Sequence, residues 1–130
     1  MMRQVAIVVD DQQPLRAYVS AVLRNGGFEV VEAADGRDAL SLIRRMNGVI
    51  DVLVTDIRMP RMTGIELVSC VESDFPDIPV VYMSGEVPQK GLLNWRAGVL
   101  FLEKPFGPQA ILKAVRTVVA PSGAAARAAG

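Results

Sequence analysis

Short apolar runs alternate with longer stretches of helical spacing along the chain. Each run is rich in β-branched residues, a composition typical of strands that are buried in a parallel sheet. Turn-forming residues, such as the stretch Asn25-Gly26-Gly27, separate the helical patterns from the next run. We therefore predict strands over residues 5–9, 28–33, 52–56, 78–84 and 99–103.

The stretches between the runs carry apolar residues three and four positions apart, which predicts amphipathic helices. Asp35 has the side chain of a helix cap, and Pro14 and Pro108 suit the first turn of a helix. The segment 85–98 has the weakest helical pattern, because it contains a proline and a glycine. The predicted helical segments begin near Pro14, Asp35, Thr63, Gly85 and Pro108.

Polar side chains follow four of the five predicted strands at the point where each strand ends. Asp10 and Asp11 follow the first run, Asp56 ends the third, Ser84 ends the fourth and Lys104 follows the fifth. In open parallel sheets, ligands bind at the carboxyl ends of the strands. We therefore expect these five side chains to form one cluster.

Alternating strands and helices indicate βαβ units around a parallel sheet. Periodicity alone does not give the strand order, but the expected cluster requires the first, third, fourth and fifth strands to lie near one another. Glu29 and Glu32 interrupt the second run, which suits a sheet edge. We predict an α/β fold, a flavodoxin-like (βα)5 doubly wound parallel sheet with strand order 2-1-3-4-5. The predicted domain covers residues 1–120, and residues 121–130 are interpreted as a disordered tail or a linker remnant.

The chemistry of the expected cluster favours phosphoryl transfer. Carboxylates of Asp10, Asp11 and Asp56 at one edge repel each other, so that a pKa rises or a cation binds. Oxygen ligands without nitrogen or sulfur favour Mg²⁺. Lys104 adds a positive charge suited to a phosphoryl oxygen, and Asp56 is central enough to act as the nucleophile.

Composition excludes several other classes of function. The chain has no histidine and a single cysteine, Cys70, which argues against a zinc site. Its net charge is zero and its aromatic residues are few, so neither direct nucleic-acid binding nor an anionic membrane surface is favoured. No signal peptide or membrane-spanning stretch is evident, which predicts a soluble cytoplasmic protein.

The order of these motifs resembles the receiver domain of two-component response regulators, over about residues 4–119. The matching pieces are Val-Val-Asp10-Asp11, Asp56-Ile-Arg-Met-Pro60 followed by Gly64, Met-Ser84-Gly85, and Phe101-Leu-Glu-Lys104-Pro105-Phe106. Gln12 replaces the acid that often follows the Asp pair, and Ser84 replaces the commoner threonine.

The resemblance implies a phosphorylation-dependent switch rather than an enzyme. Asp56 is expected to accept phosphate from a phosphohistidine of a sensor kinase or a histidine phosphotransfer protein. Mg²⁺ (or Mn²⁺) is expected at Asp10, acting through water, Asp11, Asp56 and the backbone carbonyl of Arg58. The residues expected to hold the phosphoryl group are Ser84, Gly85 and Lys104, with a cis peptide bond before Pro105.

The resemblance also implies how the signal leaves the site. Ser84 and Phe101 are the expected switch residues, and they remodel the surface of the fourth helical segment, the fifth strand and the last helix. The expected partners are the kinase, facing Gln13, Leu15, Arg16 and residues 106–108, and a downstream protein or attached domain. We expect a monomer or a weak dimer.

Alternatives remain open on the sequence. An aspartyl-phosphate phosphatase of the haloacid dehalogenase type is disfavoured, because Arg58 stands where that chemistry needs a second acid. A pseudo-receiver that acts only by interaction is disfavoured by the intact site residues. The chain can be a free-standing regulator or a piece of a larger protein such as a hybrid kinase. Arg58 and Glu86 have opposite charges, and we expect them to pair across the mouth of the site and hinder attacking water.

Overall fold

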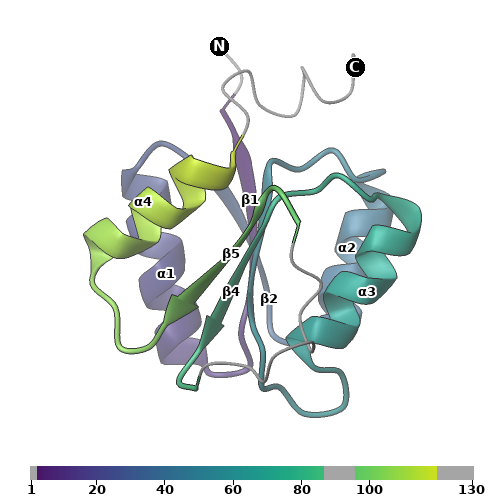
Figure 1. Cartoon of the computed structure of the whole chain (residues 1–130), viewed down its shortest axis with the longest axis horizontal. Coiled ribbons are helices and arrows are strands. Elements are labelled where there is room, and N and C mark those ends of the chain that lie inside the picture. Colours follow the sequence, from purple (N-terminus) through teal and green to yellow (C-terminus); the bar gives the residue numbers. More distant parts are fainter. Residues whose placement is uncertain (1–2, 87–95, 120–130) are drawn as a thin grey trace.

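The computed structural model describes residues 3–86 and 96–119. Its elements are the strands β1 (Val5–Val9), β2 (Glu29–Ala33), β3 (Val52–Asp56), β4 (Val80–Ser84) and β5 (Val99–Glu103), and the helices α1 (Gln13–Asn25), α2 (Gly36–Arg45), α3 (Gly64–Asp74) and α4 (Pro108–Val118) (Figure 1). Most of the predicted fourth helical segment, residues 87–95, and the predicted tail lie outside the described residues. Within residues 3–86 and 96–119, no helix has the length and apolar character needed to cross a membrane.

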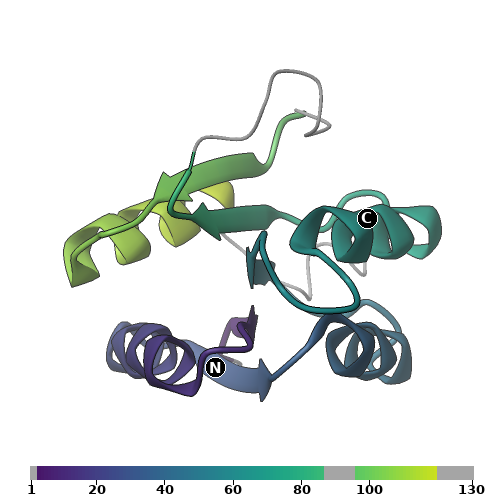
Figure 2. The same ribbon diagram turned by 90° about the horizontal axis from the view of Figure 1, so that it is seen from below.

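The five strands form one parallel sheet in the order β2-β1-β3-β4-β5, which confirms the predicted order. The sheet is the middle layer: α1 and α4 cover one face and α2 and α3 the other (Figure 2). The edge prediction for the second strand is also confirmed, since β2 lies at the end of the described sheet, next to β1.

Alternation along the buried strands divides the core into two halves. In β1, Ala6 and Val8 point toward the α1 and α4 face, whereas Ile7 and Val9 point toward the α2 and α3 face. All four side chains are fully buried. A strand covered on both faces has no polar side, which is why these runs are continuously apolar.

Two predicted strands begin later than their apolar runs, because the first amide is engaged elsewhere in one case and missing in the other. The amide of Phe28 donates to the carbonyl of Leu23 at the end of α1, at 3.0 Å, so β2 begins at Glu29. Pro79 has no amide hydrogen, and β4 begins at Val80. Phe28 and Ile78 are nevertheless buried in the core.

Capping side chains begin α2 and α3, and the predicted cap of α2 by Asp35 is confirmed. The Asp35 carboxylate accepts a hydrogen bond from the amide of Asp38 at 2.8 Å and caps α2. Thr63 and Glu66 form a reciprocal capping box at the start of α3. These caps fix the two loops that pass close to the carboxyl ends of β2 and β3.

Candidate functional site

Three carboxylates converge at the carboxyl ends of two neighbouring strands. Asp10 and Asp11 follow β1, and Asp56 is the last residue of β3, which pairs with β1. One carboxylate oxygen from each of the three lies within 4.8 Å of the others. Asp10 is fully buried and Asp56 is 5% exposed, whereas Asp11 is exposed to solvent. The structure therefore brings together the carboxylates predicted from the strand ends.

Asp10 is the most deeply buried of the three acids. Its Oδ1 accepts a hydrogen bond from the amide of Gln12 at 2.9 Å, while its Oδ2 is buried with no hydrogen-bond partner among the described residues. Burial raises the pKa of Asp10, and the charges of Asp56 and Asp11 raise it further; the Gln12 amide and Lys104 act in the opposite direction. An unpaired buried carboxylate oxygen is costly unless a proton or a cation satisfies it.

Lys104 lies directly against the central acid. Its Nζ is 3.2 Å from Oδ2 of Asp56, an ion pair in which the Asp56 side chain is 7% exposed and the lysine 23%. The backbone amide of Lys104 donates to the carbonyl of Ser84 at 2.8 Å and extends the pairing of β4 and β5 by one residue. The peptide bond between Lys104 and Pro105 is cis.

The other predicted ligand residues, Ser84, Gly85 and Arg58, lie on the loops and strand ends next to Asp56 and Lys104. Ser84 ends β4 and is buried, and its Oγ accepts a hydrogen bond from the amide of Glu86 at 3.2 Å. Gly85 follows it and is exposed. The Arg58 guanidinium donates to Glu86 Oε2 at 2.6 Å, with both side chains more than 70% exposed. The predicted pairing of Arg58 with Glu86 is therefore confirmed, whereas metal binding by the Arg58 carbonyl stays a prediction.

Gly64 allows α3 to begin directly beneath the site. A Cβ built at Gly64 lies 2.1 Å from the carbonyl oxygen of Asp56 and 3.1 Å from the Cα of Ile57. The amide of Gly64 donates to the carbonyl of Ile57 at 2.8 Å. Only a residue without a side chain permits this approach, which explains why the sequence motif around Asp56 includes a glycine eight residues later.

Phe101 lies in β5 opposite Tyr82 of β4, two residues before the polar end of the strand. It is half-buried and packs against the core half that faces α2 and α3. The neighbouring Tyr82 is almost fully buried, and burial raises the pKa of its phenol to about 12. Phe101 thus belongs to the packed sheet, and its role as a switch stays a prediction.

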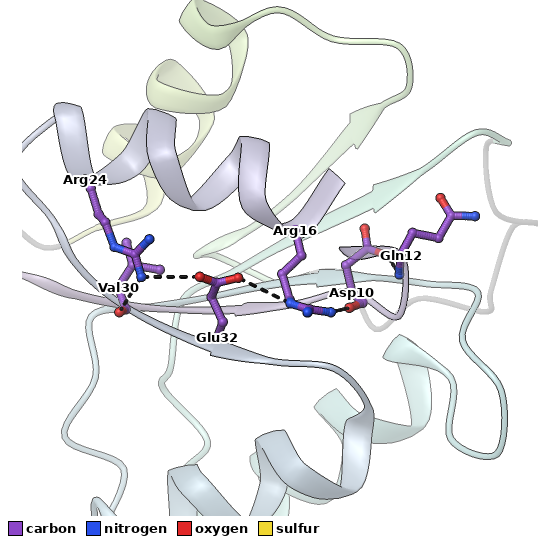
Figure 3. Close-up of polar contacts among 6 residues, drawn as sticks. All are labelled: Asp10, Gln12, Arg16, Arg24, Val30 and Glu32. Carbon is purple, nitrogen blue, oxygen red and sulfur yellow. Dashed lines mark hydrogen bonds and ion pairs between the residues drawn. The ribbon is translucent and has the colours of Figure 1, made fainter. Parts of the chain in front are cut away.

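Two residues near the site, Arg16 and Glu32, were not assigned to it from the sequence. Arg16, predicted to face a kinase, donates from Nη1 to the backbone carbonyl of Asp10 at 2.7 Å (Figure 3). Its Nε donates to Glu32 of the edge strand β2 at 3.2 Å. An arginine one turn into the helix after an acidic pair was the available signal, but its partner depends on how α1 packs against β2.

The residues present fit a hard divalent cation. The cluster offers carboxylate oxygens only, one of them buried and unpaired among the described residues. Such a donor set suits Mg²⁺ or Mn²⁺. Beside it, the carboxylate of Asp56 contacts a lysine that can neutralise charge on an incoming anionic group. The arrangement can therefore activate an acid for attack on phosphorus and stabilise the group transferred.

Comparison with known proteins agrees with this geometry. Residues 6–116 match the family model described as the response regulator receiver domain. The chemotaxis protein CheY of Pseudomonas aeruginosa is 33% identical over 117 residues, which cover 86% of this chain and 93% of CheY. The structure of the chemotaxis response regulator CheY4 of Vibrio cholerae superposes with a TM-score of 0.82 and 33% identity, covering 91% of this chain and all of CheY4.

Relatives of other sizes match as well. Sensor kinase CckA of Brucella abortus is 30% identical over 115 residues, which cover 87% of this chain but 12% of CckA. The chain spans half or less of the length of several curated relatives it matches. The chain belongs to the response regulator receiver domain family of two-component systems, whose members are regulatory phosphoacceptor domains rather than enzymes.

Proposed function

We propose that this domain is a switch in which Asp56 accepts a phosphoryl group from a phosphohistidine of a sensor kinase or a histidine phosphotransfer protein. The contact between Lys104 Nζ and Asp56 Oδ2, beside the converging carboxylates of Asp10 and Asp11, is the observation that supports this most directly. This sequence contains no histidine, so the phosphohistidine must lie outside these 130 residues.

In the proposed step, a carboxylate oxygen of Asp56 attacks phosphorus while the P–N bond of the phosphohistidine breaks. The histidine nitrogen leaves with the bonding electron pair and is protonated, and Asp56 becomes an acyl phosphate. Lys104 follows the transferred group and neutralises one of its oxygens, and Ser84 and Gly85 offer a hydroxyl and a backbone amide to the others. Asp11, Asp56 and the Arg58 carbonyl would hold Mg²⁺ or Mn²⁺, with Asp10 acting through water, and the cation would supply charge neutralisation for the transferred group.

The output is proposed to leave through β5 and its neighbours. Phosphorylation breaks the ion pair of Lys104 with Asp56 and draws the Ser84 hydroxyl away from the Glu86 amide toward the phosphoryl oxygens. Phe101 then fills the space left near β4, which alters the surface of β5 and α4. The predicted fourth helical segment, the third part of the expected output surface, lies mostly outside the described residues. A downstream protein or an attached domain reads that surface, and the domain itself is a monomer or a weak dimer.

Intact-protein mass after incubation with acetyl phosphate tests the acceptor. Wild type is expected to gain the mass of one phosphoryl group in the presence of Mg²⁺ and none in EDTA. Asp56→Asn is expected to gain none in either condition, because the amide lacks the nucleophilic oxygen charge. Should acetyl phosphate and a phosphohistidine donor both fail while Mg²⁺ binds, the pseudo-receiver interpretation replaces this one.

The pair of Arg58 and Glu86 is expected to lengthen the life of the phosphorylated state. Their exposed side chains meet at 2.6 Å on the two loops that flank Asp56, so that they hinder an attacking water. Glu86→Ala is expected to speed loss of the phosphoryl group severalfold while leaving thermal stability unchanged, since exposed ion pairs contribute little. Asp74→Ala, which breaks the surface ion pair with Arg44, is the control for the decay measurement. An unchanged lifetime for Glu86→Ala contradicts the shielding role.

A further inference from the structure

A chain of polar contacts runs from Arg24, in the last turn of α1, to the acidic loop (Figure 3). Arg24 donates to Glu32 at 3.3 Å, Glu32 accepts from Arg16 at 3.2 Å, and Arg16 donates to the carbonyl of Asp10 at 2.7 Å. The two arginines come from α1 and the glutamate from β2. The last contact is the shortest, and it ends on the backbone of a site residue.

We propose that Arg16 is the positioning residue for the acidic loop, and that Glu32 orients it. The inference rests on the proposed function, because it concerns the cation site of Asp10, Asp11 and Asp56. Arg16 is not proposed to touch the cation or the phosphoryl group. It acts by holding the backbone from which two of the three carboxylates project.

The bonding of Asp10 shows why its carbonyl is the point to hold. The amide of Asp10 donates to the carbonyl of Ala33 at 3.2 Å, and Oδ1 accepts from the amide of Gln12 at 2.9 Å. With Arg16 on the carbonyl oxygen, the residue is fixed at three atoms. Oδ2 is left without a partner among the described residues. The loop is thus held without using the oxygen that a cation needs.

The guanidinium geometry makes this an arginine site. Arg16 donates with Nε to the carboxylate and with Nη1 to the carbonyl, so one planar group holds an acid of β2 and the loop after β1 at once. Its side chain is 16% exposed, compared with 51% for Arg24. A lysine offers a single ammonium and does not reproduce this fork.

Because Arg16 is positively charged, the direction in which its substitution changes the affinity for Mg²⁺ distinguishes two roles. A cation near the site repels Mg²⁺, so a residue that acts only through charge weakens Mg²⁺ binding, and its neutralisation strengthens it. A residue that positions ligands has the opposite effect, since loss of such support typically costs about 10–100-fold in metal affinity. Arg16→Gln is therefore expected to weaken Mg²⁺ binding about tenfold.

The experiment is a titration of the full chain with Mg²⁺, followed by the amide NMR signals of Asp11 and Gln12. Arg16→Gln and Arg16→Lys are expected to bind Mg²⁺ more weakly than wild type, and Glu32→Gln is expected to lie between. Arg24→Gln removes the same charge from the far end of the contact chain and is the matched control, with affinity unchanged or slightly raised. Thermal denaturation in EDTA checks that each variant is folded; if Arg16→Gln is not, the comparison rests on Glu32→Gln against Arg24→Gln.

The outcomes separate this inference from the proposed function. Wild type that binds no Mg²⁺ overturns both. Wild type that binds, with Arg16→Gln binding equally or more tightly, overturns the positioning role alone. Restoration of wild-type affinity by Arg16→Lys also overturns it, because charge and not the guanidinium fork is then what matters. Weaker binding by both Arg16 variants, with Arg24→Gln unaffected, supports it.

Discussion

Replacing Gly64 with alanine is expected to lower the free energy of unfolding by about 3 kcal/mol, the upper range for adding a group to a packed site. The added Cβ lies 2.1 Å from the carbonyl oxygen of Asp56. That neighbour is backbone at the end of the central strand β3, so it cannot rotate away. Either α3 moves away from the sheet or the end of β3 moves, and both loosen the core.

Gly36 provides a matched control for this prediction. Gly36 and Gly64 are each the first residue of a helix, and each follows a capping side chain. A Cβ at Gly36 meets the side chain of Met62, with its sulfur at 2.8 Å. Methionine is flexible and adapts to such contacts. Gly36→Ala is therefore expected to change stability by less than about 1 kcal/mol, including the gain from a less flexible unfolded chain.

Urea denaturation of the three proteins measures the difference directly. A loss of about 3 kcal/mol corresponds to a fall in melting temperature on the order of 10 °C for a domain of this size. Because the moved atoms belong to Asp56 and Ile57, Gly64→Ala is also expected to slow labelling by acetyl phosphate more than Gly36→Ala. Equal stability of the two variants contradicts the steric argument.

The sequence predicts the positions of the acids better than the contacts that hold them. A run of β-branched residues that ends on Asp56 marks both a buried strand and its functional end, and the same logic applies to Asp10 and Lys104. Parallel pairing then brings these ends together, because neighbouring strands share one edge. No precise distance is needed for that conclusion.

The contacts of Arg16 and Gly64 depend on distances that periodicity does not contain. Arg16 meets Glu32 only because α1 packs across β2, and an arginine at that position is equally compatible with an exposed helix face. The contact between Gly64 and the Asp56 carbonyl depends on the path of the intervening loop. The strand boundaries at Phe28 and Pro79 escaped prediction for a related reason, since hydrophobicity reports burial and not which amide is paired.

Asp10→Asn is expected to stabilise the metal-free protein at neutral pH by about 1–2 kcal/mol, since an unpaired buried polar group costs about this much. The wild-type carboxylate is fully buried, faces the charges of Asp56 and Asp11, and has an Oδ2 with no partner among the described residues. An asparagine amide removes the charge, and its NH₂ group can donate to a neighbouring carboxylate. The variant thus gains stability by losing a feature that suits a cation.

The pH dependence follows from the direction of the pKa change. The pKa of Asp10 is raised above its ordinary value of 3.8, so the folded protein holds this proton more tightly than the unfolded chain does. The resulting contribution to stability is fully present below pH 3.8 and is lost as the pH rises through the folded-state pKa. The advantage of Asp10→Asn over wild type is therefore expected to be largest at neutral pH and to shrink on acidification.

Mg²⁺ is expected to reverse the order of stability at neutral pH. A ligand that binds only the folded state stabilises it by about 2.7 kcal/mol at a hundredfold excess over its dissociation constant. Wild type should gain this, whereas Asp10→Asn should gain little, because its amide oxygen is uncharged. Thermal denaturation at several pH values gives the stability of wild type and of Asp10→Asn, each in EDTA and in Mg²⁺.

Asp51→Asn is the control for removing a buried carboxylate elsewhere. Asp51 is 1% exposed and accepts a hydrogen bond from the amide of Val5 at 2.6 Å. This contact lies at the amino ends of β1 and β3, at the edge of the sheet opposite the acidic site. Its replacement is expected to leave the shift caused by Mg²⁺ unchanged. Two outcomes contradict this account: Asp10→Asn is less stable than wild type in EDTA, or it is stabilised by Mg²⁺ as much as wild type is. Either shows that the Asp10 carboxylate serves the structure of the fold and not cation binding.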